Sequence, residues 1–172
     1  IFSDASFKAC AAIFGHHWLQ MIFPESWKEV HIAAKELSPV MLAFKLWGVE
    51  LKGVNILVLV DNISIVHVLN NKTSKDPIIM KMMRQMVIHA MSIHTEFGST
   101  HIKGKNNVLP DLISRLQEDK AKTIADKIKS RLEDGNMKGF LLPPYDPSAN
   151  ECKSAQKPLM FAYLNAFEAE SG

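Results

Sequence analysis

The chain has 172 residues, of which 47% are hydrophobic and 22% are charged, a balance that is typical of a globular protein and excludes an intrinsically disordered one. No apolar run approaches the roughly 18–20 residues that a membrane-spanning helix needs. Two cysteines are too few for a disulfide framework or a zinc site. The net charge of +2 is compatible with a polyanionic partner without requiring one.

The start of the chain predicts three short strands, over residues 1–7, 9–14 and 18–23. The turn signal Gly15-His16-His17 separates the second strand from the third and favours an antiparallel hairpin. The sequence opens directly in strand-like residues, without an initiator methionine or a signal peptide. We therefore expect the chain to be a fragment of a longer protein.

A helix and a buried strand are expected next. Ser26 and Glu29 have the spacing of a capping box, and a helical pattern runs from there to Trp47. Pro39 lies inside that pattern and is expected to kink the helix, because it removes one backbone hydrogen bond. Val54–Val60 is an apolar run rich in β-branched residues, which is typical of a parallel strand covered on both faces.

The following residues alternate helices with one further strand. The expected elements are a helix at 62–70, a helix at 78–94, a strand at 100–103 and a helix at 110–117. The full order of elements predicts an α/β fold with a mixed five-stranded sheet flanked by helices. In this sheet an antiparallel hairpin is extended by parallel strands that crossover connections add. Residues 1–117 are predicted to form this one domain.

The character of the sequence changes after residue 117. Residues 118–135 are expected to form an amphipathic helix, because apolar residues recur at helical spacing between charges until Gly135. Residues 136–172 are expected to be a linker rich in Asn, Pro, Ser and Lys. The apolar stretch Leu159–Phe167 within them is interpreted either as a docking segment or as the start of a further domain.

Four acidic residues occupy positions where an acid is unusual: Asp4 in the first strand, Glu36 on the apolar helix face, Asp61 at the end of the most apolar strand, and Asp111 in the first turn of the helix at 110–117. A single Asp at a strand end or helix start is usually a turn former or a cap. A carboxylate on an apolar face, as at Glu36, needs a cation or a polar pocket nearby. Acids that converge repel one another unless metal ions neutralise them, and sites made only of oxygen ligands favour Mg²⁺ or Mn²⁺.

The segments around three of these acids form a recognisable set: Ser3-Asp4-Ala5-Ser6, then Lys35-Glu36-Leu37-Ser38-Pro39-Val40, then Val60-Asp61-Asn62. In this order the chain resembles the ribonuclease H domain of reverse-transcribing elements, and more narrowly that of DIRS-type retrotransposons. The narrower resemblance depends on the stretches KELSPVMLAFKLWG, LNNKTSKDPIIMKMMR and HIKGKNNVLPDLISRLQ, the last of which carries Asp111 and Ser114-Arg115. The resemblance covers residues 1–117.

This resemblance implies a ribonuclease H-like fold and metal-dependent endonucleolytic hydrolysis of the RNA strand of RNA–DNA hybrids. The family's catalytic, metal-binding acids correspond to Asp4, Glu36, Asp61 and Asp111, which would hold two Mg²⁺ (or Mn²⁺) ions, with Asp4 and Asp61 as the bridging ligands. The polyprotein is then expected to carry a reverse transcriptase domain upstream and, in some members, a tyrosine recombinase downstream. An intracellular location, in the cytoplasm or nucleus, follows, with no membrane partner.

Five further residues are candidates for binding the substrate. Lys103, Lys105 and Arg115 could contact phosphates, although a solvated surface explains them equally well. Asn62 and Asn107 could bind 2′-hydroxyls or the minor groove, although capping or turn formation is the more ordinary explanation.

Several departures from the family pattern keep other functions open. Phe7-Lys8-Ala9-Cys10-Ala11 lacks the usual glycines after the first acid, Pro110 replaces an alanine, and the loop Lys105-Asn106-Asn107-Val108 lacks a histidine. The main alternative is a catalytically inert or degenerate connection module that binds nucleic acid or joins the polymerase to a recombinase. A third hypothesis is a DNA-cutting integrase or resolvase of the same broad fold.

Overall fold

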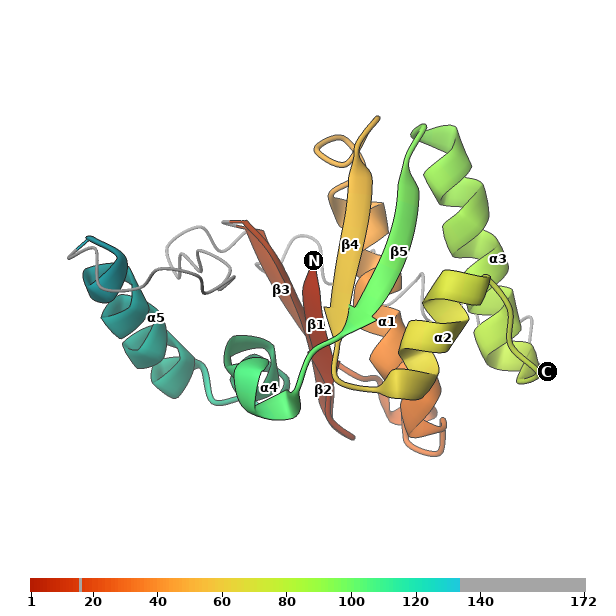
Figure 1. The fold of residues 1–172 in the computed structure, drawn as a ribbon. Coiled ribbons are helices and arrows are strands. Elements are labelled where there is room, and N and C mark those ends of the chain that lie inside the picture. The colour runs from red at the N-terminus through yellow and green to blue at the C-terminus, as the bar shows by residue number, and fades with distance from the viewer. Residues whose placement is uncertain (16, 134–172) are drawn as a thin grey trace.

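The computed structural model describes residues 1–15 and 17–133, and its centre is a five-stranded mixed sheet with the order β3-β2-β1-β4-β5 (Figure 1). The strands are β1 (Phe2–Ala5), β2 (Ala9–Phe14), β3 (His17–Ile22), β4 (Asn55–Val60) and β5 (Glu96–His101). The first three strands pair antiparallel, whereas β4 pairs parallel with both β1 and β5. The predicted α/β architecture, a ribonuclease H-like mixed sheet, is confirmed.

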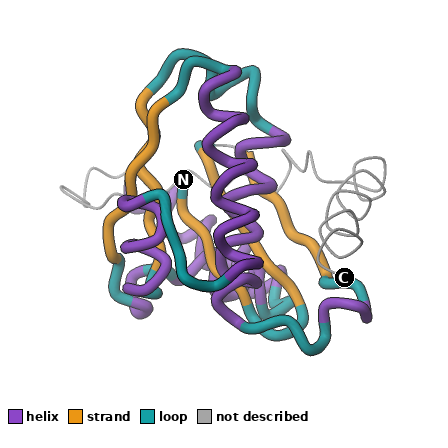
Figure 2. The backbone as a smooth tube through the Cα atoms, turned by 90° about the vertical axis from the view of Figure 1, so that its right-hand side faces the viewer, coloured by secondary structure: helices purple, strands orange, loops and turns teal. Residues whose placement is uncertain are grey.

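Helices cover both faces of this sheet. They are α1 (Ile32–Leu46), α2 (Ile63–Asn71), α3 (Pro77–Ser92), α4 (Val108–Ser114) and α5 (Glu118–Glu133), with single 3-10 turns at Glu25–Trp27 and Gly104–Asn106. α1, α2 and α3 lie on one side and α4 and α5 on the other (Figure 1), and the view from the side of α3 shows helices in front of the strands (Figure 2). None of the helices in the described part of the chain has the length and apolarity that crossing a membrane demands.

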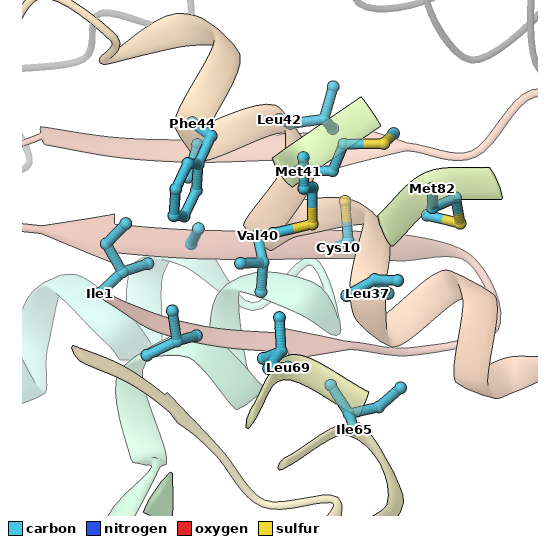
Figure 3. Close-up of a cluster of buried hydrophobic side chains, with 14 of the residues drawn as sticks. Ile1, Cys10, Leu37, Val40, Met41, Leu42, Phe44, Ile65, Leu69 and Met82 are labelled. Carbon is cyan, nitrogen blue, oxygen red and sulfur yellow. The ribbon is translucent and has the colours of Figure 1, made fainter. Parts of the chain in front are cut away.

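The larger core lies between the sheet and the helices α1, α2 and α3. Leu37, Val40 and Phe44 of α1 are buried there, together with Leu69 of α2 and Met82 of α3 (Figure 3). Because α1 presents one apolar side to the sheet over its whole length, its position over the central strand β1 is fixed. This position determines where Glu36 lies.

A smaller core on the opposite face holds α4. Ile13 of β2 and Trp18 of β3 pack there against Leu109 and Ile113, and Ala121 of α5 completes the cluster. α4 is a short helix, so this packing and not its own length keeps it helical. The cluster thereby fixes the helix that carries Asp111.

The beginning of α1 differs from the prediction. Ser26 does not cap the helix: residues 25–27 form a 3-10 turn, and α1 begins at Ile32 after His31, whose Nδ1 accepts a hydrogen bond from the amide of Ala33. The physical reason is Trp27, which is buried and stacks on Phe23 with ring centroids 5.6 Å apart. Burial of this large ring holds residues 25–27 against the core and delays the helix.

Pro39 lies inside α1 without ending it. A proline cannot donate to the carbonyl four residues earlier, here that of Lys35. The hydroxyl of Ser38 donates to this carbonyl instead, at 2.6 Å. The local side-chain bond therefore satisfies the group that proline leaves without a backbone partner, and the helix continues to Leu46.

Two other boundaries also shift. β5 occupies 96–101 and not 100–103, because it pairs in register with the whole of β4, from Asn55 with Glu96 to Val60 with His101. α4 begins two residues before Pro110 and ends at Ser114, with Leu116 in the left-handed region. The amphipathic helix expected at 118–135 is present as α5, whereas residues 134–172, including the expected linker, lie outside the described residues.

The free edge of β5 is closed by side chains of α2. The side-chain Nδ2 of Asn70 donates to the carbonyl of Ser99 at 2.9 Å, and the side-chain Oδ1 of Asn70 accepts from the backbone N–H of Ser99 at 2.7 Å. Lys72 donates to the carbonyl of Phe97 at 2.6 Å, and its ammonium lies 3.7 Å from the centroid of that ring. Backbone groups of an edge strand invite pairing with another chain, and these contacts occupy them.

We expect Asn70→Ala to lower the free energy of unfolding by about 1–3 kcal/mol, because it leaves two backbone groups of Ser99 without their partner. Urea denaturation followed by circular dichroism measures this change. The matched control is Asn71→Ala, at the exposed neighbouring position. An equal loss in both variants would show that the two bonds to Ser99 contribute nothing specific.

Candidate active site

Sheet register brings two of the four predicted acids together. β1 and β4 are adjacent and parallel, and Phe2 pairs with Leu59. Two residues further along each strand lie Asp4 and Asp61, at the same end of the sheet. The carboxyl ends of parallel strands are where α/β sheets form their ligand sites. The distant positions 4 and 61 thus become neighbours because of strand pairing alone.

The other two acids come from opposite faces of the sheet. Glu36 lies on α1, which packs on the larger core, and Asp111 lies on α4, which packs on the smaller one. Coulombic repulsion reaches Asp4 from Asp61 and Asp111, and reaches Glu36 from Asp61 and Asp4. Asp4 therefore lies within electrostatic range of each of the other three acids.

Asp4 is the most buried member of the group, with 9% of its surface exposed. The pKa of its carboxyl is raised to about 7: burial is the largest cause, the neighbouring acids Asp61 and Asp111 add to it, and a hydrogen bond from Ser114 acts in the opposite direction. The hydroxyl of Ser114 donates to Oδ2 of Asp4 at 2.6 Å. A carboxylate in these surroundings gains strongly from a nearby cation.

Glu36 is in a similar position. Burial is the main cause that raises the pKa of its carboxyl to about 7, with Asp61 and Asp4 adding to it. The side chain of Asn62 hydrogen-bonds to this carboxyl and lowers its pKa, but Oε2 of Glu36 is buried without any hydrogen-bond partner. A buried acceptor without a partner is unusual and marks a position where a ligand would be stabilised.

Asp61 and Asp111 are more accessible. Asp61 is exposed directly after β4, while Oδ1 of Asp111 accepts from Nε of Arg115 at 2.7 Å, one turn further along α4. The four acids thus range from buried Asp4, through partly buried Glu36 and Asp111, to exposed Asp61.

The chemistry of these ligands fits a hard divalent cation. Four carboxylates supply oxygen donors without sulfur, as Mg²⁺ and Mn²⁺ prefer, and the partnerless oxygen of Glu36 would be completed by such an ion. Nevertheless, no three His, Cys, Asp or Glu side chains within residues 1–15 and 17–133 are already grouped as a metal site. Three of the carboxylates already accept a hydrogen bond from a neighbouring side chain: Asp4 from Ser114, Glu36 from Asn62 and Asp111 from Arg115. Ligation of a metal by the four acids is therefore a prediction.

Two residues beside Asp61 were not among the sequence-based candidates. A Cβ at Gly104 would lie 3.3 Å from Oδ2 of Asp61, so any larger residue would crowd this carboxylate. Nε2 of His101, the last residue of β5, lies 3.1 Å from the backbone carbonyl of Asp61. The loop after β5 lacks a histidine, but the strand itself ends on one next to the site, which becomes visible only through the pairing of β4 with β5.

The candidate substrate-binding residues divide into two groups. Lys103, Lys105 and Arg115 are exposed, and the two lysines flank Gly104 beside Asp61. The structure contradicts the prediction for Asn107, which is 1% exposed and whose side-chain amide donates to the carbonyl of Ser3, so it cannot reach a bound duplex. Asn62 is partly exposed but its Oδ1 caps α2. Burial and capping thus give these asparagines structural roles.

Phe7 is a further residue that the sequence analysis did not single out. Its ring is 73% exposed in the turn that follows Asp4. Lys35, itself 1% exposed, donates to the carbonyls of Phe7 and Lys28 at 3.2 Å each, and its ammonium lies 5.6 Å from the centroid of the Phe7 ring. Lys35 therefore holds the turn that carries this exposed aromatic ring, three residues after Asp4. An apolar residue in a turn was the only sequence signal.

Comparison with models of protein families and with curated proteins gives no match to this chain.

The raised pKa values predict a pH-dependent stability. Because the pKa of Asp4 rises from 3.8 to about 7 on folding, protonation favours the folded state, and this contribution is lost as the pH rises from about 4 to about 7. Asp4→Asn imitates the protonated form. We expect it to be more stable than the wild type by on the order of 1–3 kcal/mol at pH 8 and equally stable at pH 4.

Urea denaturation at both pH values measures this difference. Glu36→Gln should behave alike, since the pKa of Glu36 rises from 4.5 to about 7. Asp126→Asn, at an exposed position of α5, is the control and should change nothing. Parallel pH profiles of the wild type and Asp4→Asn would contradict the burial of a charge at this position.

Proposed function

We propose that this protein is the ribonuclease H part of a retrotransposon reverse transcriptase polyprotein and hydrolyses the RNA strand of RNA–DNA hybrids endonucleolytically. The observation that carries the proposal is that buried Asp4 lies within electrostatic range of the other three predicted acids, at the end of the sheet where β1 and β4 finish. Asp4 and Asp61 come from adjacent parallel strands, and Glu36 and Asp111 come from opposite faces. Like charges that repel a buried carboxyl are unfavourable unless a cation offsets them.

The four carboxylates would hold two Mg²⁺ or Mn²⁺ ions, with Asp4 and Asp61 between them. When bound, such ions activate a water for attack on phosphorus and stabilise the departing 3′ oxygen. The chain itself supplies two carboxyls, Asp4 and Glu36, that are partly removed from water. Burial also strengthens the attraction of these two carboxylates for a cation, because the local dielectric is low.

Basic side chains around the acids support a nucleic acid substrate. Lys103, Lys105 and Arg115 are exposed, and phosphate contacts of this kind position a duplex without reading its sequence. Arg115 is bonded to Asp111, so it places a positive charge directly beside an acid of the site. A duplex bound over these residues would bring a phosphate to the acids.

The proposed function implies the remaining parts of the polyprotein. A reverse transcriptase domain would precede this domain, because the hybrid is the product of reverse transcription, and a recombinase could follow it. The expected compartment is the cytoplasm or the nucleus, where such hybrids form.

Cleavage of a hybrid labelled in its RNA strand tests the proposal. We expect Mg²⁺-dependent cleavage by the wild type and a loss of about 100-fold or more in Asp61→Asn, since even residues that only support a metal ligand contribute 10–100-fold. Asp126→Asn is the matched control at an exposed position outside the site. Equal cleavage by Asp61→Asn and the wild type would refute the mechanism.

One observation favours the alternative of an inert connection module. In the described part of the chain the acids are not grouped as a finished metal site. In addition, the side chain of Arg115 forms an ion pair with Asp111. Tight binding of a hybrid without Mg²⁺, and with no cleavage, would support that alternative. Preference for a DNA duplex over the hybrid would support a DNA-cutting enzyme of the same broad fold.

Phe7 gives a separate prediction on substrate binding. An exposed aromatic ring beside a nucleic acid site can stack on a base or sugar, and such stacking contributes about 1–3 kcal/mol. We expect Phe7→Ala to raise the KM for the hybrid about 10-fold with little change in kcat, and Phe7→Trp to retain binding. Met91→Ala, at an exposed apolar residue of α3, is the control. An unchanged KM in Phe7→Ala would exclude stacking.

A further inference from the structure

The side chain of Ser114 lies at the centre of the contact between α4 and β1. It is fully buried, and its hydroxyl oxygen lies 2.6 Å from Oδ2 of Asp4 and 2.9 Å from the carbonyl of Asp111. A hydroxyl has one proton to donate, so these two acceptors compete for it.

Distance and charge both favour Asp4 as the acceptor. The contact to Asp4 is the shorter one, and hydrogen bonds to an ionised carboxylate are roughly twice as strong as bonds to a neutral carbonyl. The carbonyl of Asp111 also accepts from the backbone N–H of Arg115 at 3.1 Å, so it has another donor. The hydroxyl of Ser114 therefore donates its hydrogen bond to Asp4.

The backbone around Ser114 is fixed independently of this hydroxyl. The carbonyl of Ser114 accepts from the hydroxyl of Ser6 at 2.8 Å, and the carbonyl of Ile113 accepts from Nε2 of Gln20 at 2.8 Å. These bonds connect the end of α4 to the turn after β1 and to β3. The hydroxyl of Ser114 therefore has its position set by the fold, and the contact with Asp4 is a consequence of that position.

We propose that Ser114 is a positioning residue for the metal site: it fixes Oδ2 of Asp4 and so presents the other oxygen of this carboxylate to a divalent cation in one orientation. This inference rests on the proposed function of the same acids. Ser114 follows Asp111 by one helical turn. One turn of α4 therefore supplies both a ligand, Asp111, and the group that orients a second ligand, Asp4. A carboxylate that rotates freely would lose part of its binding energy in becoming ordered.

The ordinary alternative is that the bond only helps α4 to pack on the sheet. A series of residues of similar size separates the two roles. Ser114→Cys keeps a weak donor in the same volume, and Ser114→Ala removes the donor. Ser6→Ala and Gln20→Ala weaken the attachment of α4 to the sheet without touching Asp4.

The experiment measures Mn²⁺ binding to the whole chain by isothermal titration calorimetry, together with kcat and KM for the RNA–DNA hybrid. We expect the Kd for Mn²⁺ to rise about 10-fold in Ser114→Ala, with an intermediate rise in Ser114→Cys, as for other groups that orient metal ligands. kcat should fall by about 10–100-fold while KM stays unchanged, since the residue does not contact the duplex. Ser6→Ala and Gln20→Ala should bind Mn²⁺ as the wild type does.

Two results would overturn the inference. The first is an unchanged Kd for Mn²⁺ in Ser114→Ala, including the case in which the wild type binds no Mn²⁺. The second is a rise in the Kd for Mn²⁺ in Ser6→Ala and Gln20→Ala as large as that in Ser114→Ala, which would show that the effect comes from the packing of α4 on the sheet. A wild type that binds Mn²⁺ in a Ser114-dependent manner but cleaves no hybrid would refute the proposed function alone, because the metal readout does not depend on cleavage.

Discussion

The burial of the Asp4 carboxyl in the central strand is the constraint on which the rest of this structure depends. β1 lies in the middle of the five strands, and a charge in that place is unfavourable both through desolvation and through the repulsion from Asp61, Asp111 and Glu36. The surrounding side chains are arranged to reduce this penalty. Ser114 donates to Asp4, Asn62 to Glu36, and Arg115 to Asp111.

These donors come from the same short elements that carry the acids. Asn62 follows Asp61 directly, and its Oδ1 caps α2, which leaves its amide nitrogen available for Glu36. Ser114 and Arg115 follow Asp111 by about one turn of α4. Each accessible acid therefore brings a donor for itself or for a buried partner. The donors and the acids that they stabilise are thus carried by the same few elements.

Two further sets of side-chain contacts hold neighbouring elements of the fold together. Lys35, next to Glu36 in sequence, connects the turn after β1 to the segment before α1 through two carbonyls. Asn70 and Lys72 bind backbone groups of Phe97 and Ser99 at the edge of β5. Neither set of contacts includes an acid, but Lys35 belongs to α1, which also carries Glu36.

The sequence by itself determined the order of strands and helices, the mixed sheet and the four acids as a candidate set. Periodicity and β-branched runs are local signals that survive without knowledge of the fold. The sequence pattern placed the start of α1 too early, because burial of Trp27 overrides the capping pattern at Ser26. It made β5 too short, because pairing with β4 extends a strand whose own sequence signal is weak. Only the tertiary structure decided that Asn107 is buried, that Ser114 donates to Asp4 and that His101 lies beside Asp61. These are contacts between residues far apart along the chain, and such contacts are fixed by strand register and helix packing rather than by any local pattern.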